Sequence, residues 1–235
     1  MTGTFADLSQ RKAVTYLRIL YPIWVVVGIF SIMYVPSTLI VPGDAATTAN
    51  NLMANELLFN ASIIGSLITQ LIHIVVVLVL YELFKSVNKN QATLIVVLGL
   101  VGVPIAMLND LNQVAAQLVL SGADYLAVLT ADQSQSLMMF FLNLNKQGIL
   151  IASIFWGLWL FPIGTLTYES RYFPKLFGHL MIIAGFGYLL GSLAHLLLPN
   201  DESIIFQVFD LMTYGEVIFM LWVVVRGAKL PETAA

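Results

Sequence analysis

Long apolar stretches alternate with short polar segments along the whole chain, and this pattern predicts membrane-spanning helices. A transmembrane helix needs ~20 mostly apolar residues. Six stretches meet this condition, at about residues 16–41, 56–86, 92–120, 135–167, 175–198 and 203–226. We therefore predict an all-α fold, a polytopic membrane helical bundle with six transmembrane helices. We expect residues 1–235 to form a single integral membrane domain.

Composition agrees with a membrane protein and excludes several other classes. Hydrophobic residues make up 59% of the chain and charged residues 10%, whereas a soluble domain carries about 25% charged residues. The formal net charge of −3 argues against a nucleic-acid partner, which would favour a basic surface. Cysteine is absent, which excludes disulfides and thiolate metal sites. We expect the lipid bilayer to be the main partner, and the oligomeric state stays open.

The basic residues predict an orientation. Nine of the ten Lys and Arg residues flank the apolar stretches on one side of a six-span arrangement: Arg11, Lys12, Arg18, Lys85, Lys89, Arg171, Lys175, Arg226 and Lys229. The alternate loops instead carry carboxylates, at Asp44, Glu56, Asp124, Asp132, Asp201 and Glu202. The positive-inside rule then places both termini in the cytoplasm. Asp44 is also a candidate N-cap for a short helix that begins at Ala45.

Polar residues inside the spans predict a site, because such groups are costly in hydrocarbon and usually face other helices. Lys146, the tenth cation, lies inside the fourth span, and we expect it to approach Asp110 of the third span. Small and polar residues share helical faces, and we expect them to line a polar cavity that opens outward. The candidate ligand-binding residues are Asp110, Lys146, Asn109, Gln113, Asn143, Gln147, Gln70, His73, Asp210, Tyr214 and His195. Glu216 is expected to point elsewhere, about 120° from Asp210 around its helix.

Three functions remain open at this point. The first is binding or transport of a small polar or zwitterionic solute, in which Lys146 meets an anionic group and Asp110 or Asp210 a cationic one. The second is an intramembrane metal-dependent enzyme using His73, His195 and the two aspartates, although no HExxH motif is present. The third is an accessory or scaffold protein, in which Asp110 and Lys146 form a structural ion pair. We predict no cofactor and no catalytic residue.

Several short motifs resemble one known family. They are LIVPGDAATTA at 39–49, ELLF at 56–59, LYELFKSVNKNQATL at 80–94, LSGADYL at 120–126, FPKLFG at 173–178 and LLLPN at 196–200. With these motifs the chain resembles the bacterial multi-pass membrane family called domain of unknown function 4386, from about residue 14 to 227. The resemblance implies a helical protein of the bacterial inner (plasma) membrane. It transfers no catalytic residue to this chain.

Overall fold

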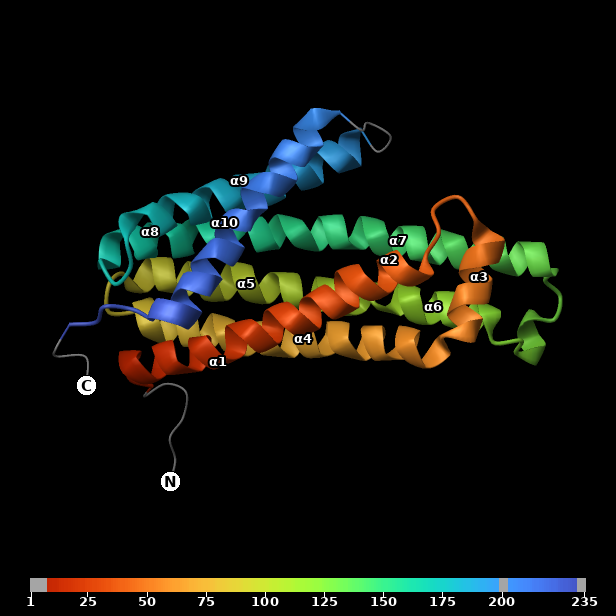
Figure 1. The fold of residues 1–235 in the computed structure, drawn as a ribbon, viewed down its shortest axis with the longest axis horizontal. Coiled ribbons are helices and arrows are strands. Elements are labelled where there is room, and N and C mark those ends of the chain that lie inside the picture. Colours follow the sequence, from red (N-terminus) through yellow and green to blue (C-terminus); the bar gives the residue numbers. More distant parts are fainter. Residues whose placement is uncertain (1–7, 199–202, 232–235) are drawn as a thin grey trace, which may run out of the picture. The chain divides into compact units, whose positions relative to one another are not determined.

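The computed structural model describes residues 8–198 and 203–231 of the 235-residue chain. Regular structure in these ranges is helical (Figure 1). The helices are α1 (Gln10–Gly28), η2 (Ile29–Tyr34), α2 (Val35–Leu39), α3 (Ala45–Ala54), α4 (Glu56–Phe84), α5 (Lys89–Asn109), α6 (Leu111–Leu120), η3 (Asp124–Leu126), α7 (Ala131–Leu158), α8 (Leu160–Ser170), α9 (Lys175–Leu197) and α10 (Ile204–Arg226). The predicted loop carboxylates Asp201 and Glu202 lie outside the described residues.

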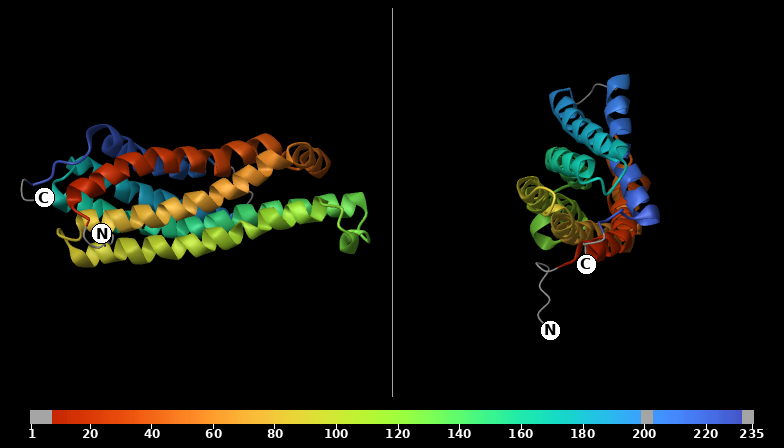
Figure 2. Two further views of the ribbon diagram at one scale, coloured as in Figure 1. Left: turned by 90° about the horizontal axis from the view of Figure 1, so that it is seen from below. Right: turned by 90° about the vertical axis from the view of Figure 1, so that its left-hand side faces the viewer.

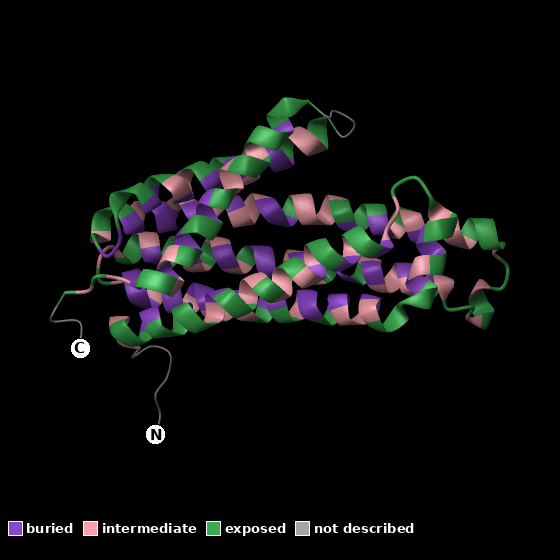
Figure 3. Cartoon of the chain, viewed as in Figure 1, coloured by how far each residue is buried: buried purple, intermediate pink, exposed green. Residues whose placement is uncertain are grey.

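Six helical segments are long and apolar enough to cross a membrane. They are Gln10–Leu39, Glu56–Phe84, Lys89–Leu120, Ala131–Ser170, Lys175–Leu197 and Ile204–Arg226. Each also exposes large apolar side chains, such as Val26, Leu57 and Leu211, and Figure 3 shows exposed positions along every span. Extensive exposed apolar surface is uncommon on soluble proteins and is typical of contact with a membrane or with another protein. The predicted all-α polytopic membrane fold with six transmembrane helices is confirmed.

The first span changes its helical geometry midway. Its π-helix η2 precedes Pro36, the second residue of α2. Proline has no backbone N–H and its ring clashes with the carbonyl group four residues earlier, so a wider turn before it is a local accommodation. The backbone N–H of Val35 accordingly donates to the Phe30 carbonyl oxygen, five residues back. This wider turn carries Ser31, which is buried.

A short capped helix follows the first span, as the sequence predicts. The Asp44 carboxylate accepts from the Thr47 backbone N–H at 2.9 Å and from the Thr47 hydroxyl group at 2.7 Å. These bonds satisfy a free amide group of the first turn of α3. The backbone amide of Thr47, followed by its hydroxyl group, holds the pKa of Asp44 below its ordinary value of 3.8.

The chain divides into two compact units. The first unit comprises Met1–Ile23, Ile72–Pro104 and Leu150–Ala235, and the second comprises Trp24–Leu71 and Ile105–Ile149. The core of the second unit is apolar and is formed by Val35, Leu39, Ala49, Leu52, Phe59, Ile63, Ala116, Val119, Met138 and Leu142. These residues hold α2, α3, α6 and the second-unit parts of α4 and α7 together.

Small residues bring helices of the first unit close together. Helices α9 and α10 lie side by side (Figures 1 and 2). A Cβ atom added at Gly187 would lie 2.8 Å from the Phe209 carbonyl oxygen of α10. Gly164 and Gly178 make a similar backbone contact between α8 and α9. Such faces let helices pack closely in a membrane, and they determine which side of α10 is buried.

Candidate functional site

Asp110 lies at a one-residue irregularity in the helix of the third span. It is the residue between α5 and α6, and its backbone carbonyl oxygen accepts from the Gln113 backbone N–H at 3.0 Å. Only 6% of Asp110 is exposed. The backbone of Asp110 stays helical, with φ of −62° and ψ of −19°. A buried carboxyl group within a membrane span is by itself a candidate for a ligand contact.

Polar side chains from α4 and α6 surround this carboxyl group. The Ser66 hydroxyl group of α4 lies against it, and Gln113 Nε2 donates to Asp110 Oδ1 at 3.5 Å. Gln70 follows Ser66 by four residues, so both share one face of α4. Ser66, Gln70 and Gln113 are all buried.

Several acceptor oxygens of this cluster have no hydrogen-bond donor within the described residues. Within the described residues, Asp110 Oδ2, Gln70 Oε1 and Gln113 Oε1 are buried and accept no hydrogen bond from the protein. The buried Ser31 hydroxyl group of η2, which can donate as well as accept, also has no hydrogen-bond partner within the described residues, and it faces Gly65, the residue before Ser66. A buried polar group without a partner costs ~1–3 kcal/mol. A donor-bearing or cationic group placed here would lower that cost.

The second unit carries a net negative charge, as does the cluster around Asp110. Its two segments contain five carboxylates, Asp44, Glu56, Asp110, Asp124 and Asp132, but one cation, Lys146. The expected approach of Lys146 to Asp110 is wrong, because Lys146 is exposed and forms no ion pair within the described part of the chain. Helix α7 buries Met138, Leu142 and Asn145 instead, at four- and three-residue spacing. Lys146 is one position further, about 100° around the helix, and its long side chain reaches the surface.

Asn109 forms a structural clamp rather than an open ligand contact. Its Nδ2 donates to the Asn145 carbonyl oxygen at 2.8 Å, and Asn145 Nδ2 donates to the Asn109 carbonyl oxygen at 3.1 Å. Asn112 Nδ2 adds a bond to Asn109 Oδ1 at 3.0 Å. Gly148 gives the Asn109 carboxamide group its space, since a Cβ atom there would overlap it. Asn145 was not among the predicted residues, although Gly148 three residues later signals a close helix contact.

Two other predicted residues of α7 form no hydrogen bond with this cluster in the described part of the chain. Asn143 is exposed, and its Nδ2 donates to the Met139 carbonyl oxygen of its own helix at 2.9 Å. Gln147 is half-buried. The prediction that Asn143 faces inward is therefore wrong, for the same rotation of α7 that exposes Lys146.

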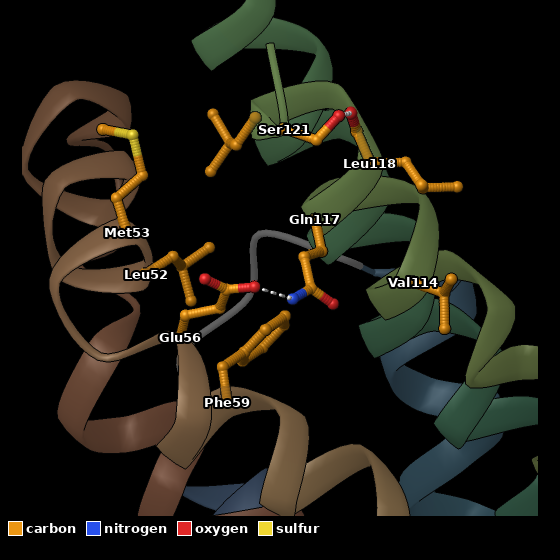
Figure 4. A pocket seen from close by; sticks show the side chains of 9 residues that line it. Leu52, Met53, Glu56, Phe59, Val114, Gln117, Leu118 and Ser121 are labelled. Carbon is orange, nitrogen blue, oxygen red and sulfur yellow. Dashed lines mark hydrogen bonds between the residues drawn. The ribbon is translucent and has the colours of Figure 1, made fainter. Parts of the chain in front are cut away.

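A pocket of about 430 Å³ opens near the α3 end of the second unit. Gln117 Nε2 donates to Glu56 Oε1 at 3.4 Å across it, and the Phe59 ring lies beside this pair (Figure 4). Phe59 is buried and belongs to the apolar core. Counting ~1.5 Å per helical residue, Glu56 lies ~15 Å along α4 from Ser66, and Gln117 lies ~10 Å along α6 from Asp110. The pocket and the Asp110 cluster thus occupy the same two helices at different depths.

The remaining predicted residues lie in the first unit. His73 is buried, bonds to the Gly99 backbone and packs on Trp159 with 4.6 Å between ring centroids. His195 Nδ1 lies 2.9 Å from the Gly191 carbonyl oxygen, and its ring packs on Phe206. These contacts give both histidines structural partners.

The buried carboxylate of α10 is Glu216, not Asp210 as predicted. Asp210 and Tyr214 are exposed, so the prediction that they face a cavity is wrong. Glu216 is buried, and the Tyr188 hydroxyl group of α9 donates to its Oε2 at 3.1 Å. Gly215 packs against the Leu180 carbonyl group of α9, which turns the neighbouring Glu216 inward. The glycine beside Glu216 was the available signal in the sequence.

A protein-only metal centre finds no support. Among residues 8–198 and 203–231, no group of three or more His, Asp or Glu side chains is arranged to hold a metal ion. Catalytic zinc sites use three protein ligands. The predicted metal ligands His73, His195, Asp110 and Asp210 form no such group within these residues.

Comparisons with known proteins identify the family of the chain. An uncharacterized protein from Archaeoglobus fulgidus is 28% identical over 174 residues, which is 74% of this chain and 88% of that protein. No solved structure matches the chain. Residues 19–227 match the family described as a domain of unknown function, DUF4386. The chain, with its six apolar spans, therefore belongs to the DUF4386 family.

Proposed function

We propose that this protein binds a small cationic or hydrogen-bond-donating solute at Asp110, inside the second unit. The observation that carries the proposal is the group of unpaired buried acceptors: Asp110 Oδ2, Gln70 Oε1 and Gln113 Oε1 have no donor within the described residues. Each such group costs ~1–3 kcal/mol when unpaired. An ammonium group or a desolvated monovalent cation contacts several oxygens at once, so its binding removes more than one of these costs.

The exposure of Lys146 narrows the class of ligand. A zwitterionic solute needs a cation beside the carboxylate to meet its anionic group, and the second unit has no buried cation within the described residues. An anionic solute would add a second uncompensated negative charge beside Asp110, which is unfavourable at low dielectric. Solutes with a positive charge or with donors alone are therefore favoured.

The pocket beside Glu56 is the proposed entrance. The Glu56 carboxylate attracts cations to this end of the α4 and α6 pair, and the buried Phe59 ring lines the pocket. Transport across the bilayer would be an extension of this binding step, and its test is uptake of the same cation into proteoliposomes.

The proposed location is the inner (plasma) membrane, with both termini cytoplasmic. Support comes from the distribution of Lys and Arg among the loops. Because the chain contains no cysteine, single cysteines at Ala46 and at Ala228 provide a direct test. A membrane-impermeant maleimide should label position 46 in intact cells and position 228 only after lysis; the reverse pattern would contradict this orientation.

Ligand-dependent stabilisation of the purified protein tests the binding step. Sodium, potassium, ammonium and methylammonium chlorides are compared at constant ionic strength, with N-methylglucamine chloride as the balancing salt. A ligand at 100 times its Kd stabilises the folded protein by ~2.7 kcal/mol. At ~2–4 °C per kcal/mol for a chain of this size, we expect the thermal midpoint to rise by about 5–11 °C for the preferred cation.

Two Asp→Asn variants form a matched pair for this experiment. Asp110→Asn replaces the carboxylate by an amide whose N–H groups can donate to the neighbouring oxygens, so we expect the cation-dependent shift to disappear. Asp132→Asn makes the same chemical change at an exposed position of α7 and should keep the full shift. The proposal fails if no cation stabilises the wild type, or if Asp110→Asn retains the wild-type shift.

A further inference from the structure

A second hollow, in the first unit, has a positively charged lining. It has a volume of about 600 Å³ and lies where the turn after α8 meets the end of α10. Arg171 comes from that turn, Arg226 from the last turn of α10 and Lys229 from the segment after it. No carboxylate lines the hollow within the described residues. Three cations from three separate chain positions therefore converge on one space.

The walls of this hollow are fixed by backbone and aromatic contacts. The Lys229 backbone N–H donates to the Tyr172 carbonyl oxygen at 2.8 Å, which ties the segment after α10 to the turn after α8. The Tyr172 hydroxyl group accepts from Gln10 Nε2 at 2.7 Å, and Phe173 packs on Phe219 with 5.1 Å between ring centroids. Arg171 itself has φ of 60°, a conformation that is uncommon for residues other than glycine. The cations are thus carried on a defined frame.

The three cations also lack the partners that neighbouring cations have. Lys175 lies 4.6 Å from the centroid of the Tyr168 ring, and Lys85 pairs with Glu82. Within residues 8–198 and 203–231, Arg171, Arg226 and Lys229 form no ion pair. Cations near helix C-termini interact favourably with the helix dipole, but that interaction needs no shared hollow. Convergence without a counter-charge points to an anionic ligand.

We infer that this hollow binds a phosphate group, supplied by the headgroup of an anionic phospholipid or by free phosphate. Guanidinium groups bind phosphate oxygens in bidentate fashion, and lysine adds a mobile point charge. Trp222 lines the same hollow, and tryptophan is enriched at the membrane–water boundary. Basic pockets beside transmembrane helices commonly hold phospholipid headgroups. This site is independent of the Asp110 cluster and of the function proposed for it.

Lipid binding to the full-length protein tests the inference. The protein is purified in a neutral detergent and titrated with phosphatidylglycerol, phosphatidylcholine or inorganic phosphate, and bound lipid is counted by native mass spectrometry. Dissociation constants are obtained from the shift in thermal midpoint. We expect phosphatidylglycerol to bind at least ten-fold more tightly than phosphatidylcholine. Stabilisation by inorganic phosphate alone, to the same extent, would assign the site to free phosphate.

Charge-removing variants locate the binding site. We expect Arg171→Asn and Lys229→Gln each to weaken phosphatidylglycerol binding about five-fold, and the double variant about 25-fold, from the typical strength of a basic residue at a lipid surface. Asparagine tolerates the left-handed backbone of residue 171, and Lys229 keeps its backbone bond to Tyr172 as glutamine. Each variant must keep the lipid-free thermal midpoint of the wild type within 2 °C for its affinity to be compared; Arg226→Gln replaces any variant that does not.

Lys175→Gln is the matched control. It removes one positive charge at the first residue of α9, which does not line the hollow. Because Lys175 already contacts the Tyr168 ring, its loss should weaken lipid binding less than two-fold. Equal losses for Lys175→Gln and the hollow variants would overturn the inference, because binding would then follow the general surface charge. Equal affinities for phosphatidylglycerol and phosphatidylcholine, without binding of inorganic phosphate, would overturn it as well.

Discussion

The Asn109–Asn145 clamp predicts a large effect for a small substitution, Gly148→Ala. The new methyl group would overlap the Asn109 carboxamide group. That group cannot rotate freely, because Nδ2 donates to the Asn145 carbonyl oxygen at 2.8 Å and Oδ1 accepts from Asn112 at 3.0 Å. Relief of the overlap therefore requires loss of these bonds or displacement of α7 from its neighbour.

Three contributions determine the expected change in unfolding free energy, two of them destabilising and one stabilising. Hydrogen bonds between membrane helices average ~0.6 kcal/mol and reach ~1.7 kcal/mol, so two lost bonds cost ~1–3 kcal/mol. Residual overpacking adds about 1 kcal/mol at the low end of its usual range. Replacing glycine by alanine in a helix returns up to ~1 kcal/mol. We expect a net loss of ~1–3 kcal/mol in unfolding free energy, which lowers the thermal midpoint by ~2–12 °C at ~2–4 °C per kcal/mol.

Reversible unfolding in mixed micelles measures this loss, and a double-mutant cycle shows its cause. Asn109→Ala removes the obstacle, so the Gly148→Ala substitution should cost nothing further in that background. We expect a coupling energy of ~1–3 kcal/mol between positions 109 and 148. Gly28→Ala is the control, because a Cβ atom there would lie at an ordinary 3.6 Å from Thr69 Cγ2. It should be neutral or slightly stabilising.

Two outcomes would refute the reasoning. A Gly148→Ala protein as stable as the wild type would mean that the Asn109 carboxamide group moves without loss. Additive effects of Gly148→Ala and Asn109→Ala would mean that the methyl group destabilises the helix contact by another route.

Two further predictions concern the Asp44 cap and the carboxylate of α10. The Thr47 amide holds the pKa of Asp44 below its ordinary 3.8, so its contribution to folding is present above pH ~4 and is lost as pH falls through the lower, folded-state pKa. In the wild type, the hydrogen-exchange protection of the Thr47 amide should fall over that acidic range. The Asp44→Ala variant should show low protection at every pH. If its protection equals that of the wild type, the cap is contradicted. Tyr188→Phe removes the donor to buried Glu216 and should lower the unfolding free energy by ~1–3 kcal/mol. Adding Glu216→Met should recover most of this loss, which would confirm the pair. A double variant as unstable as Tyr188→Phe alone would contradict it.

Part of the candidate site follows from sequence, and part does not. Asp110, Gln113 and Gln70 are buried, as their shared faces in the third and second spans led us to expect. Their placement follows from the high cost of exposing polar groups to lipid. The unpartnered acceptors in the same cluster could not be foreseen, because hydrogen-bond pairing depends on the side chains of neighbouring helices. The bonding of Asn109 to Asn145 is the clearest case.

The amino-acid sequence was enough to give the number and approximate positions of the spans and the cap at Asp44, although the first span begins at Gln10 and the fourth extends over Ala131–Ser170, beyond their predicted limits. Span length depends on the run of apolar residues, and a cap depends on one side chain and the amides two or three residues later. Which side of α7 and of α10 is buried depends instead on contacts with neighbouring helices. Both sides of these helices carry polar groups, and the periodicity of a single helix cannot rank them. Asn145 is buried rather than Lys146, next to the space that Gly148 leaves for the Asn109 side chain. Glu216 is buried rather than Asp210, next to the contact of Gly215 with the Leu180 carbonyl group.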